Sequence, residues 1–467
     1  MKTYVIVGTG GRSIMFTRAL TSEFVASSKL LAICDKNKGR LQLTKKNLKK
    51  CCLELATYMD NDFDRMLSEQ NPNCVIVCTM DSTHDDYICR SLEAGCDVIT
   101  EKPMTIDEKR CQRIVNTVKK TSKSVRVTFN YRYSPSRSQI KELLMSGVIG
   151  KILSVEFKWL LDTNHGVDYF RRWHRNKANS GGLMVHKATH HFDLVNWWLS
   201  STPETVFAKG DRLFYNEKQA RRYGLENHGD RCLNCSVKDK CNFYLDMNKF
   251  ETIKKLYLDC EQYDGYIRDC CVFSNDIDIE DSIDVIVGYK SSALLSYSLC
   301  AFSPWEGYKV EFNGTRGRLE HSCQESSYIN GDGCVQGAFD PESAITRIYL
   351  HFKTPYSVKV KEGQGGHGGG DIVMLNDIFG SPPKDPLMRS ADYVQGAYSI
   401  LVGVAANKSI ASGRLINVKD LVSGLPDAKF PDMPGEEEYI PYVADAKRYI
   451  DGEKTDANVP LKLQNDS

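Results

Sequence analysis

The sequence has no excess of charge of either sign. Its 467 residues include 61 lysines and arginines against 60 aspartates and glutamates, which gives a net charge of +1. Proteins that bind nucleic acids or anionic membranes concentrate basic charge, so we expect neither kind of partner. The sequence also has no run that approaches the ~20 apolar residues needed to span a membrane. These absences favour a globular protein that binds no nucleic acid and no membrane.

The first residues also lack a signal-peptide pattern, because Met1 and Lys2 lead directly into a strand-like run and then into glycines. The 17 cysteines of a chain without an export signal are expected to be reduced thiols. We therefore expect a cytoplasmic protein.

A length of 467 residues favours roughly two to three domains. In residues 1–124, short unbroken apolar runs alternate with helical patterns. The runs are Tyr4–Val7, Leu30–Cys34, Cys74–Cys78 and Asp97–Ile99. Unbroken runs are typical of parallel strands that are buried on both faces. Residues 1–124 are therefore predicted to form an α/β Rossmann domain with a doubly wound parallel sheet.

The pattern changes at about residue 125. Between Leu153 and Trp159 apolar and polar residues alternate, which indicates a strand with one solvated face. We predict that residues 125–426 form an α+β domain for substrate binding and oligomerisation, with a large, mainly antiparallel sheet. A cysteine-rich insertion is expected at about residues 210–275, and residues 427–467 are expected to form a tail on the surface. Helices are predicted at Leu183–Leu199, Asp371–Phe379 and Ala391–Ala411.

A glycine-rich turn follows the first apolar run. Gly8 and Gly10 occupy positions of a dinucleotide-binding fingerprint, in which the first glycine makes the tight turn and the second lets the pyrophosphate approach the backbone. Ser13 replaces the third glycine, and its small side chain still allows close packing of helix on strand. Arg12 is a candidate phosphate contact. This turn predicts a dinucleotide site.

The choice of dinucleotide depends on Asp35, which ends the second apolar run. A carboxylate at this place accepts hydrogen bonds from the adenosine ribose and favours NAD over NADP. Lys36 or Arg40 could offset its charge and admit a 2′-phosphate. We predict NAD as the cofactor.

A second motif, Glu101-Lys102-Pro103-Met104, follows the fourth apolar run. A lysine at the carboxyl end of a parallel strand faces the crevice in which such sheets bind ligands. With the glycine turn and Asp35, this motif resembles the Gfo/Idh/MocA family, named for glucose–fructose oxidoreductase and inositol dehydrogenase. The segments that extend the resemblance are Cys78–His84, Phe129–Pro135 and Ser180–Asp193.

The resemblance implies hydride transfer between NAD and a secondary hydroxyl of a sugar, polyol or glycoside. Lys102 and His190 match the family's catalytic lysine and histidine. Cofactor contacts are implied for Thr79, His84, Glu101, Lys102 and Asn130.

His186 stands where the family usually has an aspartate. Without that carboxylate, a protonated His190 loses its usual stabiliser. A spacing of four residues puts both rings on one helical face, so His186 is a candidate second proton acceptor or substrate contact. The same spacing can chelate zinc, but Lys187 stands where zinc proteases have glutamate. Both histidines are alternatively core residues.

The insertion contains Cys232, Cys235 and Cys241. Three closely spaced thiols in a reducing compartment predict a structural zinc ion, with free thiols as the alternative. Cys271 is the best fourth ligand, since its Arg-Asp-x-Cys-Val-Phe context resembles a segment of long family members. The other candidates for the fourth ligand are Cys270, Cys260 and His228.

Two further segments are candidate substrate contacts. The glycine loop 365–370 lacks the Lys-Ser/Thr pair of a phosphate loop. Similar loops lie near the substrate pocket in long family members, which implies that His367 contacts the sugar; a plain linker is the alternative. Arg171, Trp173 and His174 are also predicted substrate contacts, because aromatic rings and arginine suit polyol recognition, with interdomain packing as the alternative.

The leading hypothesis is therefore an NAD-dependent sugar or polyol dehydrogenase that also holds a structural zinc ion. One alternative is a glycosidase or lyase that oxidises its sugar only transiently and releases no NADH. Another is a non-catalytic NAD-binding sensor, which the intact Lys102 and His190 disfavour. We expect a homodimer or homotetramer formed through the sheet of the second domain.

Overall fold

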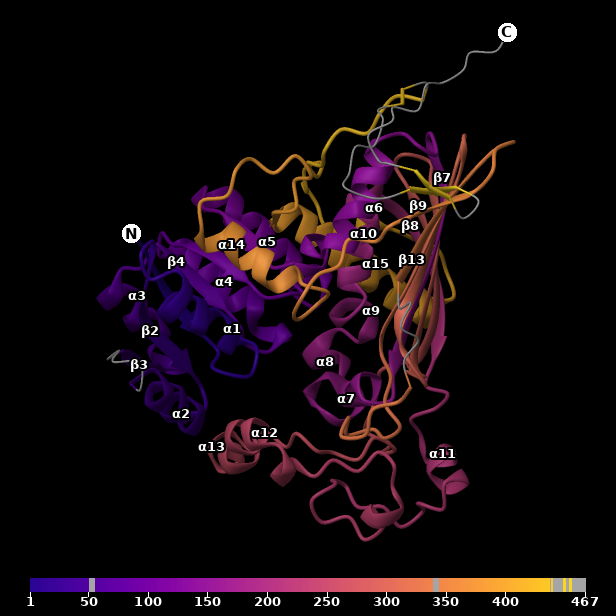
Figure 1. Ribbon diagram of the computed structural model, residues 1–467. Coiled ribbons are helices and arrows are strands. Elements are labelled where there is room, and N and C mark those ends of the chain that lie inside the picture. The colour runs from indigo at the N-terminus through magenta and orange to yellow at the C-terminus, as the bar shows by residue number, and fades with distance from the viewer. Residues whose placement is uncertain (50–54, 339–343, 437, 440–447, 451–452, 456–467) are drawn as a thin grey trace.

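The computed structural model of the chain describes residues 1–49, 55–338, 344–436, 438–439, 448–450 and 453–455 (Figure 1). Its first domain is built on a seven-stranded sheet of order β15-β6-β5-β4-β1-β2-β3. The strands are β1 Lys2–Val7, β2 Ser28–Asp35, β3 Ala56–Met59, β4 Cys74–Val77, β5 Asp97–Thr100, β6 Val125–Val127 and β15 Ala391–Asp392. The helices are α1 Ser13–Arg18, α2 Lys38–Lys49, α3 Phe63–Gln70, α4 His84–Glu93 and α5 Glu108–Thr121.

The strands β1 to β6 are parallel, and only β15 runs antiparallel to its neighbour β6. All four residues of β4 are buried, as an unbroken apolar run predicts for a strand covered on both faces. The doubly wound parallel sheet is therefore confirmed.

The second domain carries an 11-stranded sheet of order β16-β8-β9-β10-β7-β11-β12-β13-β14-β17-β18. The strands are β7 Ile152–Asp162, β8 Pro203–Asp211, β9 Ser282–Tyr289, β10 Leu294–Ser303, β11 Glu306–Gly314, β12 Gly317–Ser326, β13 Ala344–Leu350, β14 Tyr356–Val358, β16 Ile416–Asn417, β17 Arg448–Ile450 and β18 Glu453–Thr455. Neighbouring strands are antiparallel except β7 and β10. The sheet is mainly antiparallel, as predicted.

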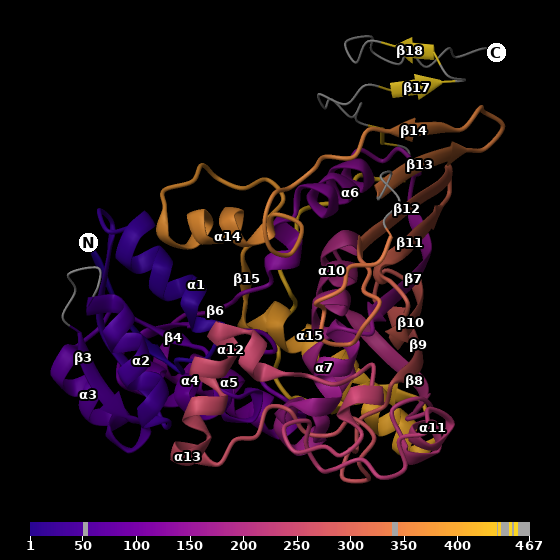
Figure 2. The same ribbon diagram turned by 60° about the horizontal axis from the view of Figure 1, so that its bottom comes forward.

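Helices cover the face of this sheet that is turned toward the first domain (Figure 2). They are α6 Pro135–Met145, α7 His165–Arg171, α8 Lys177–Ser180, α9 Leu183–His186, α10 Thr189–Leu199 and α15 Tyr393–Ser412. The helix α14 Gly370–Phe379 packs instead on the first domain, where Phe379 contacts Tyr4 and Phe24. In β7, Phe157 and Trp159 are buried whereas Glu156 and Lys158 are exposed, so the alternation read from the sequence marks the covered and open faces. Among the described residues, no helix is both long and apolar enough to cross a membrane.

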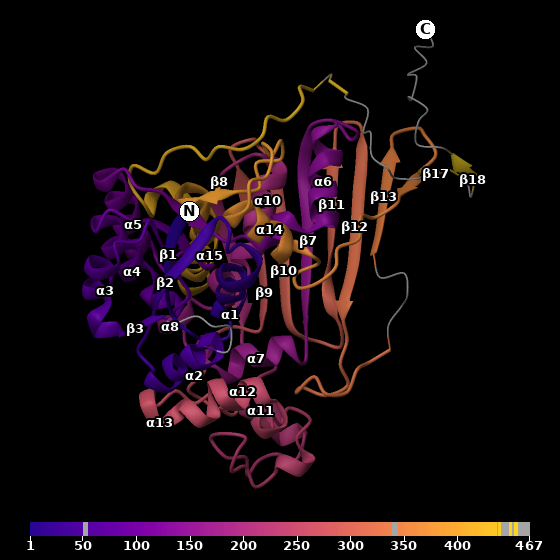
Figure 3. The same cartoon turned by 60° about the vertical axis from the view of Figure 1, so that its left-hand side comes forward.

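The insertion leaves the large sheet between β8 and β9. It contains α11 Glu217–Arg222, α12 Glu251–Leu256 and α13 Glu261–Asp264. Figures 1 and 3 show α12 and α13 next to α2, on the first domain. The insertion therefore reaches back from the second domain to the first.

Some elements differ from their predicted bounds. The helix expected over Leu183–Leu199 is interrupted, because the N–H groups of both Lys187 and Ala188 bond to the Leu183 carbonyl and form a turn. Ala391–Asp392 pairs with β6 as a strand, so the following helix begins at Tyr393. The strand β6 lies just beyond the boundary predicted at residue 124. Within the expected tail, β17 and β18 extend the large sheet.

Candidate active site

The turn between β1 and α1 has the geometry that a dinucleotide requires. Gly8 has φ 90°, and a side chain there would place its Cβ 2.5 Å from the Cys78 carbonyl oxygen. The Ser13 hydroxyl closes the turn by donating to the Gly10 carbonyl at 2.8 Å. The serine therefore stabilises the turn in place of the third glycine.

Asp35 is buried and holds the same turn. Its carboxylate accepts hydrogen bonds from the Thr9 N–H at 2.6 Å and the Thr9 hydroxyl at 2.9 Å. The Arg40 guanidinium lies 3.3 Å from Asp35 and 2.6 Å from Asp264 of the insertion. Arg40 is thus held between two carboxylates, and its charge is not free to attract a 2′-phosphate.

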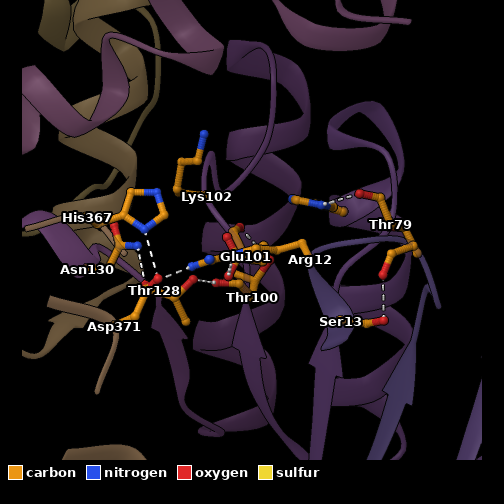
Figure 4. A network of polar contacts seen from close by, with 12 residues as sticks. Arg12, Ser13, Thr79, Thr100, Glu101, Lys102, Thr128, Asn130, His367 and Asp371 are labelled. Atoms are coloured by element: carbon orange, nitrogen blue, oxygen red, sulfur yellow. Dashed lines mark hydrogen bonds and ion pairs between the residues drawn. The ribbon is translucent and has the colours of Figure 1, made fainter. Parts of the chain in front are cut away.

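Arg12, Glu101, Asn130 and His367 meet around Asp371, the second residue of α14 (Figure 4). Arg12 donates to Glu101 at 2.8 Å and lies 3.5 Å from Asp371. Asn130 donates to Asp371 at 2.6 Å, and the His367 Nδ1 is 2.9 Å from it. Although burial opposes it, the hydrogen bond from His367 and the charge of Arg12 lower the pKa of Asp371 to about 2. The glycine loop therefore belongs to the site, whereas Arg12 is engaged by carboxylates.

Lys102 ends a chain of contacts that begins at Asp81. The His186 Nδ1 lies 2.5 Å from the Asp81 carboxylate, and the Lys102 ammonium donates to the His186 carbonyl at 3.1 Å and lies 3.5 Å from its Nε2. These partners favour the tautomer of His186 with its proton on Nδ1. Burial lowers the pKa of Lys102 to about 8, while the nearby Asp81 raises it. Asp81 therefore pairs with His186, whereas the Nδ1 of His190 has no hydrogen-bond partner among the described residues.

His190 lies on the opposite side of the helix break from His186. Its ring stacks on Tyr131 at a centroid distance of 4.1 Å, and the Tyr131 hydroxyl accepts a hydrogen bond from Lys187 at 2.9 Å. Burial and the charge of Lys102 hold the pKa of His190 well below its usual value, so the ring is neutral. The two histidines belong to different helices, which corrects the prediction that they share one helical face.

An aromatic cluster surrounds His186. The rings of Trp173 and His174 stack at 3.6 Å, and His174 meets His186 edge-on at 4.2 Å. The His174 Nδ1 is buried and has no partner among the described residues. Arg171 lies elsewhere, because its guanidinium donates to the carbonyl of Phe243 in the insertion at 3.2 Å. Of these three predicted substrate contacts, Trp173 and His174 therefore lie at the site and Arg171 does not.

Thr79 and His84 shape the loop that follows β4. The His84 ring nitrogens lie 2.8 Å and 3.2 Å from the carbonyl oxygens of Pro103 and Thr79. The Thr79 hydroxyl accepts a hydrogen bond from Thr83 at 2.8 Å. His84 therefore holds the Thr79 and Lys102-Pro103 backbones in place, rather than offering its ring to a ligand.

Four cysteines of the insertion line one cavity of about 20 Å³, namely Cys232, Cys235, Cys241 and Cys271, and His228 lines it too. The other two candidates for the fourth ligand, Cys260 and Cys270, do not line it. The Cys271 sulfur is 3.3 Å from His228 Nδ1. Across the described ranges, no three His, Cys, Asp or Glu side chains are arranged to hold a metal ion. The zinc site therefore stays a prediction.

Four residues of this region were missed by the sequence analysis, namely Asp81, Tyr131, Asp264 and Asp371. Asp81 stands in the Cys78–His84 segment that carries the family resemblance, so the sequence marks its surroundings but not its contact with His186. Tyr131 likewise stands in the Phe129–Pro135 segment, and Asp371 is four residues from His367, its partner. Asp264 acts through its contact with Arg40, 224 positions away, and no local pattern signals it.

Comparison with known proteins places this site in a family. Residues 2–129 match the description "Oxidoreductase family, NAD-binding Rossmann fold", and residues 141–419 match "Oxidoreductase family, C-terminal alpha/beta domain". YteT of Bacillus subtilis (strain 168) is 38% identical over 432 residues, which cover 90% of this chain and 99% of that protein. Inositol 2-dehydrogenase/D-chiro-inositol 3-dehydrogenase of Lactiplantibacillus plantarum is 25% identical over 69% of this chain and 84% of its own length.

Solved structures share the fold at lower sequence identity. An oxidoreductase from Agrobacterium radiobacter in complex with NAD+, L-tartaric acid and magnesium has a TM-score of 0.59 at 13% identity, over 90% of this chain and 99% of that one. The WlbA dehydrogenase from Bordetella pertussis in complex with NADH and UDP-GlcNAcA has a TM-score of 0.57 at 16% identity, over 89% and 99%. With both of its domains matched, this chain belongs to the Gfo/Idh/MocA family of oxidoreductases.

Proposed function

We propose that the protein is an NAD-dependent dehydrogenase that oxidises a secondary hydroxyl of a sugar, polyol or glycoside. The observation that carries this proposal is the chain from Asp81 through His186 to Lys102, a half-buried lysine near His190. A polyol or sugar substrate is supported by the inositol dehydrogenases among the relatives.

The residues present fit a nicotinamide dinucleotide. The turn at Gly10 is open, since a Cβ there would meet only the Tyr257 hydroxyl, at 3.7 Å. The side-chain oxygen of Asn130 and the Nδ1 of His190 are buried polar atoms without a hydrogen-bond partner among the described residues. When bound, NAD supplies the hydride acceptor.

Lys102 and His190 then have separate tasks. In its charged form Lys102 is suited to donate to the substrate oxygen and to stabilise the negative charge that develops on it. His190, neutral and stacked on Tyr131, is suited to accept the hydroxyl proton. His186, bonded to Asp81, positions the lysine.

Turnover of a carbohydrate and polyol panel tests the reaction class. A dehydrogenase produces NADH in proportion to the oxidised substrate, which absorbance follows directly. A redox-neutral glycosidase would release its aglycone without NADH, and a sensor would bind NAD and a sugar without changing either. Either of those results would contradict the proposed dehydrogenase.

We expect tighter binding of NAD than of NADP, because a 2′-phosphate would approach the carboxylates of Asp35 and Asp264. Replacing Asp264 with asparagine should release Arg40 from one of its two carboxylate partners. The preference for NAD over NADP should then become roughly tenfold smaller. Fluorescence titration with both reduced cofactors measures the preference. Asp259→Asn, an exposed change in the same insertion, is the matched control. Tighter NADP binding by the unaltered protein would refute the expectation.

We also propose that the cysteine cavity holds one structural zinc ion through Cys232, Cys235, Cys241 and Cys271. Burial raises the pKa of Cys271 to about 11, so zinc binding must displace protons and should weaken as the pH falls. Elemental analysis should find about one zinc per chain, and its removal by a chelator should lower the melting temperature. Zinc near zero in a protein of full thermal stability would leave four free thiols.

We further infer that copies of the chain associate through the open face of the large sheet, as a homodimer or homotetramer. Phe207 and Ile286 on this sheet are 41% and 55% exposed. They line a shallow groove together with charged residues of both signs, Lys158, Asp284 and Glu311 among them. Such a mixed apolar and charged face suits contact with a second copy.

A further inference from the structure

The insertion touches the first domain at the predicted cofactor turn. Three hydrogen bonds join the two: Gly11 N–H to the Tyr257 hydroxyl at 3.1 Å, Asn37 Nδ2 to the Cys260 carbonyl at 3.0 Å, and Arg40 to Asp264 at 2.6 Å. We call residues 251–264 of the insertion, which include α12 and α13, the wall segment. Figures 2 and 3 show the wall segment beside α2.

The packing between the wall segment and α2 leaves no room for a side chain at Gly39. A Cβ added there would lie 2.6 Å from the Tyr263 ring and 2.9 Å from the Cys260 sulfur. Gly39 is the second residue of α2 and is not among the residues with a positive φ, so its backbone conformation does not require glycine. The glycine is therefore explained by the close approach of the wall segment and not by the helix.

Two further residues of the insertion hold the Tyr257 ring in place. Its ring lies under the Arg268 guanidinium at 5.1 Å and meets the Tyr266 ring edge-on at 5.9 Å. Its hydroxyl accepts the N–H of Gly11, which belongs to the glycine turn of the NAD-binding domain. Backbone N–H groups of such a turn serve the pyrophosphate of a dinucleotide.

We propose that the wall segment forms the outer wall of the NAD site and retains the cofactor, with Tyr257 as a pyrophosphate-binding residue. The inference rests on the proposed NAD-dependent function. Entry of NAD exchanges the bond between Gly11 and Tyr257 for one to phosphate, and the freed hydroxyl donates to the same pyrophosphate. The contacts of Asp264 with Arg40 and of Cys260 with Asn37, which are already formed, hold the wall over the adenosine half, so release requires the wall segment to separate from α2.

Gly39→Ala tests the wall without touching a proposed cofactor contact. The new methyl group pushes the wall segment away from α2, and we expect NADH to dissociate roughly tenfold faster or more. Stopped-flow fluorescence measures the rate when the NADH-loaded full-length protein is mixed with excess NAD. Lys46→Ala, an exposed change on the same helix, should leave the rate unchanged.

Tyr257→Phe gives a second, independent measurement, because it keeps the ring between Arg268 and Tyr266 and removes only the hydroxyl. NADH release should again accelerate, and affinity should fall. Wild-type release rates in both the Gly39 and Tyr257 variants would overturn the wall while leaving NAD binding intact. Failure of the unaltered protein to bind NADH would instead overturn the proposed function, and the wall with it.

Discussion

Replacing Lys102 with alanine is expected to lower turnover by roughly 10²–10⁴-fold, while NAD affinity changes little. The alanine removes the donor that stabilises negative charge on the substrate oxygen and leaves the glycine turn untouched. His190→Ala should cause a loss of similar size, because it removes the proton acceptor. Steady-state kinetics on the best substrate of the panel measure the loss of turnover. NADH titrations measure any change in cofactor affinity.

The turnover of the unaltered protein should also depend on pH, because Lys102 loses its proton as the pH rises. Burial lowers the pKa of Lys102 to about 8, and the proposed role requires its charged form. Turnover in the oxidative direction should therefore fall as the pH rises through about 8. Lys120→Ala, the same change at an exposed lysine of α5, should keep both rate and profile. Near-wild-type turnover of the Lys102 and His190 variants would reject these roles and favour a sensor.

Changing the carboxylate of Asp81 is the second large perturbation. Asp81→Asn should lower turnover on the order of 10²-fold, because His186 loses the partner that orients it toward Lys102. Burial raises the pKa of Asp81 well above its usual value, while Lys102 lowers it, so the two groups titrate as a pair. In its ionised form Asp81 raises the pKa of Lys102, so its removal should move the alkaline fall in turnover to lower pH. If Asp81 had only a structural role, its replacement would change the stability of the protein and leave the pH dependence of turnover unchanged.

The converse substitution should shift the profile the other way. His186→Asp restores the residue usual in the family but puts a second carboxylate beside Asp81 and Lys102. The added negative charge should raise the pKa of Lys102 and move the fall in turnover to higher pH. Combining it with Asp81→Asn leaves a single carboxylate and should return the profile toward that of the unaltered protein. If the pH profile of the double variant were shifted as far as that of either single variant, the proposed pairing of positions 81 and 186 would be contradicted.

Local sequence patterns were sufficient for several strands and for the glycine turn, but strands such as β3 and β8 were not predicted. The apolar run at Cys74–Val77 is buried along its whole length, and Gly8 is required by the close approach of a neighbouring carbonyl. In contrast, the turn at Lys187-Ala188 depends on backbone bonds that apolar periodicity does not report. Periodicity alone predicted one continuous helix there.

Contacts between distant segments could not be predicted. Asp81 and His186 are 105 positions apart, and Gly11 and Tyr257 are 246 apart. Neither pair forms a motif, because each depends on how the two domains and the insertion pack. Arg171 illustrates the same limit, since an arginine next to aromatic residues suits sugar binding but here faces the insertion.

The pairing of Asp81 with His186 also bears on how the protein can be taken apart. Asp81 lies in the NAD-binding domain, while His186 lies in the domain that carries the large sheet. A fragment containing the first domain would keep the glycine turn and Lys102, and a fragment containing the second would keep both histidines. Lys102 would not be oriented in either case, because the residue that holds it, His186, lies in the other domain. Reactivity in this protein is thus not modular: joining this NAD-binding domain to the second domain of a relative that has aspartate at the position of His186 would place a second carboxylate beside Asp81.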